Sequence, residues 1–200
     1  MKGSLIIVGF FVLGTICGVC HLLPFDIAET NISYYALCAL MFSVGLSVGN
    51  DPQTLKNFRS LNPRLVFLPI MTILGTLAGS AAVSLILPHR SITDCLAVGS
   101  GFGYYSLSSI FITEYKGAEL GTIALLANIS REILTLLAAP LLVRWFGNLA
   151  PISAGGATTM DTTLPIITRT AGQQFVVVSI FHGFVVDFSV PFLVTLFCSI

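Results

Sequence analysis

The chain has 200 residues, of which 55% are hydrophobic and 9% are charged, and nine Lys or Arg balance nine Asp or Glu. Soluble domains carry roughly 25% charged residues, so the composition excludes a soluble domain. The even balance leaves no basic surface for nucleic acid and no acidic tail for a basic partner. We therefore predict an all-α, polytopic membrane protein, because a helix satisfies its own backbone polar groups in lipid.

Five stretches are predicted to be complete membrane helices, which need about 20 apolar residues each. These are residues 4–23, 33–48, 65–87, 120–146 and 173–200, the second being short enough that we expect it to extend at one end. The first superficially resembles a signal peptide. It is longer than a typical signal-peptide core and lacks a convincing cleavage site, so we predict a retained helix. One transmembrane domain is expected over residues 1–200.

Lysine and arginine lie unevenly on the first connections between these helices. Lys2 precedes the first helix, and Lys56, Arg59 and Arg64 follow the second. By the positive-inside rule, the N-terminus and the 51–64 loop are expected to be cytoplasmic. Beyond residue 87 the charges leave the topology open.

Two further stretches are apolar but contain helix breakers. They are residues 93–112, with Gly99, Gly101 and Gly103, and residues 151–170, with Pro151, Gly155, Gly156 and Pro165. One glycine-rich stretch would favour a flexible loop. Two such stretches flanking a complete helix favour broken or re-entrant helices, which form substrate and ion sites near the midplane of secondary transporters.

A polar stripe crosses the middle of the predicted 120–146 helix. Asn128, Arg131, Glu132 and Thr135 follow the i, i+3, i+4, i+7 spacing and therefore share one face. Charges at membrane depth are costly, so they favour a function. Glu132 is the candidate that exchanges a proton for a cationic substrate. The alternative is that Arg131 and Glu132 only pair with other helices and hold the bundle together.

Further candidate binding groups lie on the interrupted stretches and on the last helix. They are Ser100 and Tyr104 in the first stretch, Thr158, Thr159 and Asp161 in the second, and Asp187 in the last helix. Their oxygen atoms suit an ammonium group or a small cation. Two alternatives stay open: Asp161 and the threonines cap a half-helix, and Asp187 lies near a membrane surface. His182, alone on an apolar face, is expected to be satisfied by a neighbour.

Residues 17–21 read Cys-Gly-Val-Cys-His, the spacing that attaches c-type haem. In a membrane helix the thiols would be hidden from the machinery that loads haem. We therefore expect no haem and no other cofactor, and tetrahedral zinc is no better supported.

Three runs resemble the bacterial lysine exporter family: GSGFGYYSL at 99–107, NISRE at 128–132 and PISAGGATTMDTTLP at 151–165. The resemblance implies a cytoplasmic-membrane transporter that expels L-lysine, with toxic lysine analogues as further substrates, using a proton or ion gradient. It also implies the fold of inverted-repeat transporters with two broken helices. Glu132 matches the acidic residue of the NISRE string, and Asp161 falls in the GGATTMD string.

The chain departs from the family in length, since it resembles the C-terminal two-thirds of the full-length form. The expected source of the remaining segments is a small partner membrane protein or, less favoured, further copies of this chain. A channel, a non-transporting subunit and a haem-binding redox subunit are the alternative functions. No hydrolytic triad or phosphate-binding loop is apparent, so neither an enzyme nor an ATP-driven pump is expected.

Overall fold

The structure, a computed structural model, describes residues 12–14, 16–20, 35, 39, 63–87 and 89–200. The helices from residue 63 onward are η2 (Pro63–Val66), α4 (Phe67–Ser84), α5 (Ile92–Gly99), α6 (Tyr105–Lys116), α7 (Ala118–Phe146), α8 (Ala150–Gly155), η3 (Gly156–Met160), α9 (Leu164–Ala171), η4 (Gln173–Phe175) and α10 (Val176–Ser199). Over this part of the chain, the predicted all-α membrane bundle with interrupted helices is confirmed. The inverted-repeat arrangement and the single domain stay predictions.

Among the described residues, three helices are long and apolar enough to cross a membrane: α4, α7, and α10 together with the preceding η4 turn. They coincide with the predicted helices at 65–87, 120–146 and 173–200. The predicted helices at 4–23 and 33–48 lie outside the described residues, apart from helical residues 12–14 and 16–19, a turn at 20, and single helical residues at 35 and 39. His21 of the haem-like motif and the basic residues Lys2, Lys56 and Arg59 also lie outside them.

Both interrupted stretches are broken helices rather than loops. The first consists of α5 and α6, joined by residues 100–104, where Phe102 and Gly103 have φ angles of 45° and 93°. The second consists of α8, the 3-10 turn η3 and α9, and its direction changes at Gly156, where φ is 63°. Left-handed backbone at these points ends one helix before the next begins.

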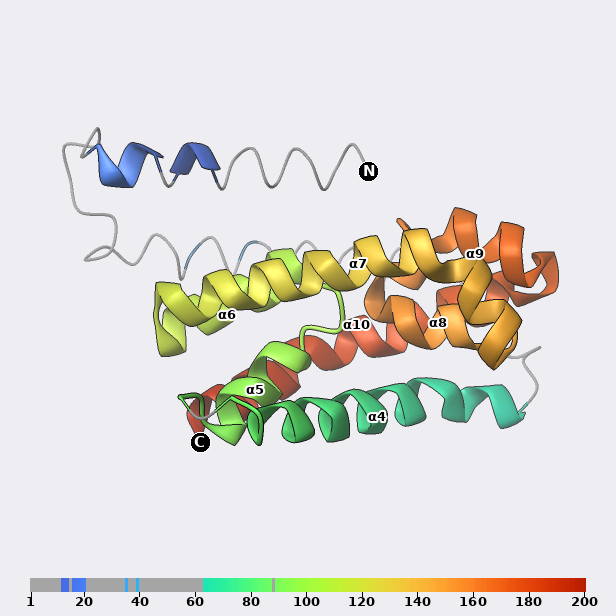
Figure 1. Cartoon of the computed structure of the whole chain (residues 1–200), viewed down its shortest axis with the longest axis horizontal. Coiled ribbons are helices and arrows are strands. Elements are labelled where there is room, and N and C mark those ends of the chain that lie inside the picture. The colour runs from blue at the N-terminus through green and yellow to red at the C-terminus, as the bar shows by residue number, and fades with distance from the viewer. Residues whose placement is uncertain (1–11, 15, 21–34, 36–38, 40–62, 88) are drawn as a thin grey trace.

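The long helices α4 and α7 run along opposite sides of the bundle, and α10 lies between them (Figure 1). The half-helices α5 and α6 pack near one end of α7, and α8 and α9 lie toward the other. Helix α10 contacts α5, α6 and η3, so the last helix touches parts of both broken stretches.

On helix α10, the spacing of the residues determines which face is buried. Val186, Val190 and Val194 are fully buried and recur every four residues, whereas Phe188 and Phe192 are about 60% exposed on the other face. Aromatic side chains on an outer face suit contact with lipid. The buried valines pack against Phe102 and Leu107, so the first break is held in the same apolar core as α10.

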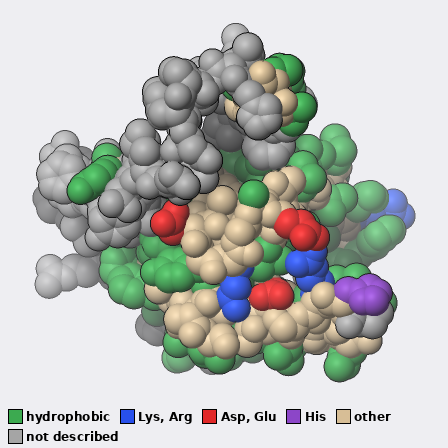
Figure 2. Space-filling model, turned by 90° about the vertical axis from the view of Figure 1, so that its left-hand side faces the viewer, with side chains coloured by type: hydrophobic (Ala, Val, Ile, Leu, Met, Phe, Trp, Pro, Cys, Tyr) green, Lys and Arg blue, Asp and Glu red, His purple; other side chains and the backbone are tan. Residues whose placement is uncertain are grey.

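One end of the bundle carries paired charges. Arg90 forms an ion pair with Glu119, and Lys116 Nζ lies 3.7 Å from Asp94 Oδ1. Figure 2 shows acidic and basic side chains gathered on this end. The acids lie in the first turns of α5 and α7 and Lys116 in the last turn of α6, the arrangement that helix dipoles favour. This end is therefore suited to a membrane surface.

Candidate functional site

The first break, at residues 100–104, and the second break, at Gly156, touch through their backbones. The Ala157 N–H donates to the Phe102 carbonyl at 2.9 Å. A side chain at Gly156 would place its Cβ 2.1 Å from the same carbonyl oxygen, and one at Gly103 would lie 3.2 Å from the Gly155 oxygen. The glycines therefore allow two broken helices to cross at backbone distance.

Asn128 on α7 holds the first break. Its Oδ1 accepts from the Gly103 N–H at 2.7 Å, and its Nδ2 donates to the Val98 carbonyl at 3.3 Å and the Ala124 carbonyl at 2.9 Å. The side chain is 3% exposed. Through its bonds to Gly103 and Val98, Asn128 thus satisfies backbone groups at the first break that an unbroken helix would have paired internally.

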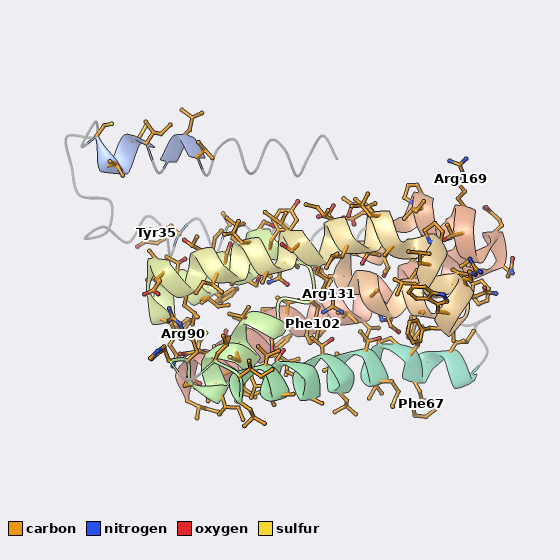
Figure 3. The ribbon with its side chains drawn as sticks, viewed as in Figure 1. Tyr35, Phe67, Arg90, Phe102, Arg131 and Arg169 are labelled. Atoms are coloured by element: carbon orange, nitrogen blue, oxygen red, sulfur yellow. The ribbon has the colours of Figure 1, made fainter. Side chains whose placement is uncertain are left out.

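Arg131, one turn further along α7, holds the second break. Its Nε donates to the Ala154 carbonyl at 2.8 Å, and its Nη2 donates to the Ser153 carbonyl at 3.0 Å. These carbonyls end α8, where unpaired acceptors and the negative end of the helix dipole favour a cation. The guanidinium also lies over the Phe102 ring, 5.9 Å from its centroid (Figure 3). Arg131 therefore joins both breaks.

Replacing Arg131 by methionine should lower the thermal stability of the purified protein. The variant leaves two carbonyls without their donor, at about 1–3 kcal/mol for each buried unpaired group. Arg131→Lys should retain only part of the stability, since an ammonium lacks the planar fork. Arg144→Met is the control on the same helix, because Arg144 is exposed in the last turn. Equal melting temperatures for Arg131→Met and Arg144→Met would contradict this role.

A cavity of about 230 Å³ lies beside the crossing, between α6, α7, η3 and α10. It is small compared with drug-binding pockets, which begin at roughly 300 Å³, so it suits a ligand of amino-acid size. Its lining residues are Gly103, Tyr104, Tyr105, Ser106, Glu132, Ala157, Thr158, Met160, Asp161, Thr162 and Asp187.

Glu132, Asp161 and Asp187 bring three carboxyl groups to this cavity from three different elements. Glu132 is 1% exposed and Asp187 is 5% exposed. Asp161, by contrast, is exposed. The Oδ1 atom of Asp187 has no hydrogen-bond partner among the described residues. Within the described part of the chain, the lining includes no lysine or arginine. The cavity therefore favours a bound cation or protons.

The structure separates the sequence-predicted candidates into two groups. Glu132, Asp161, Asp187, Thr158 and Tyr104 line the cavity. Asn128, Arg131, Thr159 and Ser100 lie outside its lining and bond to the surrounding framework. Among these, Thr159 Oγ1 donates to the Gly156 and Ser179 carbonyls, and Ser100 Oγ donates to the Leu96 carbonyl.

The structure bears on one open alternative and on the expectation for His182. Asp187 lies midway along α10 and is 5% exposed, which argues against the alternative placement near a membrane surface. His182 is satisfied by neighbours as predicted, since Nε2 lies 2.9 Å from Thr72 Oγ1 and Nδ1 lies 3.2 Å from Thr159 Oγ1. His182 thereby links α4, η3 and α10.

Sequence reasoning did not select Ala157 and Met160, which also line the cavity. Both are apolar and carry no chemical signal of their own. The only indication in the sequence was that both residues lie between Gly156 and Asp161. In a short 3-10 turn, residues this close along the chain lie near the same cavity.

Comparison with known sequences shows which family the chain is similar to. Residues 8–198 match the family model described as lysine exporter LysO. The chain is 36% identical over 196 residues to the lysine exporter LysO of Escherichia coli (strain K12), covering 98% of this chain and 64% of that protein. It is 34% identical to a putative lysine exporter of Haemophilus influenzae (strain ATCC 51907 / DSM 11121 / KW20 / Rd), covering 98% of this chain and 96% of that protein.

No solved structure matches the chain. The E. coli relative is the longer of the two, and this chain spans slightly under two thirds of it. The family match extends over both broken helices, α7 and nearly all of α10. The chain therefore belongs to the lysine exporter family, a family of membrane transporters and not of enzymes.

Proposed function

We propose that this chain exports L-lysine across the bacterial inner membrane. The observation that carries the proposal is the convergence of three carboxyl groups, those of the buried Glu132 and Asp187 and of the exposed Asp161, on one cavity beside two crossed breaks. Lysine carries two ammonium groups, and buried carboxylates are the groups that bind ammonium most strongly. The descriptions of both relatives as lysine exporters support the same substrate. Lysine analogues that keep both amines are expected to be exported too.

We propose that an inward proton gradient drives the export. Three carboxylates in a space of about 230 Å³ repel one another, so they are stable only with protons or with a cation between them. When the cavity faces the cytoplasm, lysine displaces protons from these groups. When it faces outward, protons from outside return to the carboxyls and release lysine. The same carboxyl groups thus bind either lysine or protons, but not both at once.

The crossed breaks provide the element that changes access to the cavity. Asn128 and Arg131 attach both breaks to α7 through the contacts described above. Four described elements surround the cavity, so a rotation of α7 together with the attached breaks against α10 would open different sides of it. Alternating access of this kind occurs in other transporters with broken helices. We also propose a cytoplasmic N-terminus, on the basis of Lys2 and the basic 51–64 loop.

Export of labelled lysine from vesicles that contain the purified chain tests the proposal. An imposed proton gradient should drive lysine against its concentration gradient, and a protonophore should abolish this uphill movement. Passive flux that is indifferent to the protonophore would instead support the channel alternative. The absence of lysine flux above that of empty vesicles would contradict lysine export by this chain.

The same assay tests the proposed small membrane partner. Export is measured with this chain alone and with any small membrane protein encoded beside its gene. A partner that supplies transport segments should raise export several-fold, because the chain spans 64% of the E. coli exporter. If the chain alone exports lysine and the added partner does not change the rate, a partner is unnecessary. The mass of the purified chain in detergent then tests whether several copies form the transporter.

A further inference from the structure

The first turn of α6 opens onto the carboxylate cavity. Tyr104, Tyr105 and Ser106 all line it. The first hydrogen bond of the α6 ladder runs from Ser108 N to the Tyr104 carbonyl, so the N–H groups of Ser106 and Leu107 lie in the first turn, before the ladder begins. The N-cap residue Tyr104 makes no side-chain capping bond. A helix of 12 residues that begins in this way presents partial positive charge to its surroundings.

A second observation points to a ligand in the same space. Asp187 lines the cavity, is 95% buried, and has an Oδ1 atom without a hydrogen-bond partner among the described residues. A buried carboxylate oxygen needs a donor, which an ammonium group would supply. The cavity thus combines a helix N-terminus that favours a carboxylate with carboxyl groups that favour an ammonium.

We infer that this cavity recognises the amino-acid end of its substrate: the first turn of α6, at Ser106, binds the substrate carboxylate while Asp187 binds an ammonium group. The inference rests on the proposed export of lysine and adds the orientation of the ligand. The first-turn N–H groups of Ser106 and Leu107 are the donors. Half-helix N-termini bind anionic substrate groups in the same way in other transporters.

The consequence for specificity is opposite to what charge alone would produce. Cadaverine is lysine without its carboxylate and carries a higher positive charge, so a site made only of carboxylates would bind it more tightly. A site that also holds the substrate carboxylate would bind it more weakly, because the helix N-terminus is left without its anion. L-Lysinamide, which keeps both amines but has no carboxylate, should behave like cadaverine.

Binding of L-lysine, L-lysinamide and cadaverine to the purified 200-residue chain, measured by calorimetry, tests the inference. We expect both carboxylate-free compounds to bind at least about tenfold more weakly than lysine, the effect of losing one charge-assisted hydrogen bond. Equal or tighter binding of cadaverine and lysinamide would overturn the inference and leave lysine export standing. Absence of binding for all three would overturn both proposals.

A substitution at Ser106 gives an independent test. Ser106→Asp places a carboxylate at the position assigned to the substrate carboxylate, and Ser106→Asn is the uncharged control of nearly the same shape. We expect Ser106→Asp to weaken lysine binding at least about tenfold more than it weakens cadaverine binding. An equal effect on both ligands would overturn the inference. If Ser106→Asp fails to fold, the comparison of the three ligands on the unsubstituted chain decides alone.

Discussion

Replacing Glu132 by glutamine is expected to reduce proton-driven lysine export to the level of empty vesicles. Glu132 is 1% exposed and lines the cavity together with Asp161 and Asp187. Glutamine keeps the size of the side chain but cannot carry a negative charge or exchange a proton. A charge-assisted hydrogen bond contributes roughly 1.5–3 kcal/mol, so lysine binding should weaken about 10- to 100-fold in addition.

The matched control is Glu119→Gln on the same helix. The Glu119 side chain is 78% exposed and pairs with Arg90 at one end of the bundle, away from the cavity. Exposed ion pairs contribute little to stability, so this variant should export lysine at the normal rate. Normal uphill export by Glu132→Gln would remove Glu132 from the proposed mechanism. Equal inactivity of both variants would show that the substitution acts through folding.

Replacing Gly156 by alanine is expected to prevent the two breaks from crossing. The new Cβ would lie 2.1 Å from the Phe102 carbonyl oxygen, and the backbone at Gly156 has a φ of 63°. A sparsely populated backbone conformation of this kind costs a residue with a Cβ about 1–3 kcal/mol. Overpacking typically costs about 1–3 kcal/mol more. The thermal midpoint of the purified variant should fall by several degrees, and export should be lost because the cavity walls are displaced.

Gly75→Ala on α4 is the control, because a Cβ there would meet no described atom within 4 Å. Alanine is favoured over glycine within a helix by about 1 kcal/mol, so this variant should be as stable as the unsubstituted chain or slightly more stable. Measured together, the two variants separate the cost of crossing backbones from the general effect of adding a methyl group. Equal stability of both would contradict the close crossing at Gly156.

Much of the framework follows from local chemistry and was therefore predictable. The apolar stretches at 65–87, 120–146 and 173–200 coincide with α4, α7 and α10, because the hydrocarbon core demands a fixed length of apolar helix. Glycines and prolines indicated both broken stretches, since neither residue type favours a continuous helix. The spacing of Asn128, Arg131 and Glu132 is enough to predict that they lie near one face of α7.

The roles within that stripe could not be predicted. Periodicity places residues on a helix face but does not say which neighbour each side chain meets. Asn128 and Arg131 reach backbone groups of the two breaks, whereas Glu132 reaches the cavity. Adjacent residues on a helix point about 100° apart, so Arg131 and Glu132 enter different surroundings.

The sequence by itself determined that this is a helical membrane protein with two interrupted apolar stretches and a polar stripe that includes Glu132, because hydropathy, helix periodicity and backbone propensity act within short stretches of chain. Only the tertiary structure decided that Glu132, Asp161 and Asp187 meet in one cavity and that α6 begins beside them. These residues come from α7, the end of η3 and α10, which are distant in the sequence. These three carboxyl groups meet because of packing between elements, including the close backbone approach at Gly156. A pattern within a short stretch of sequence cannot predict such packing.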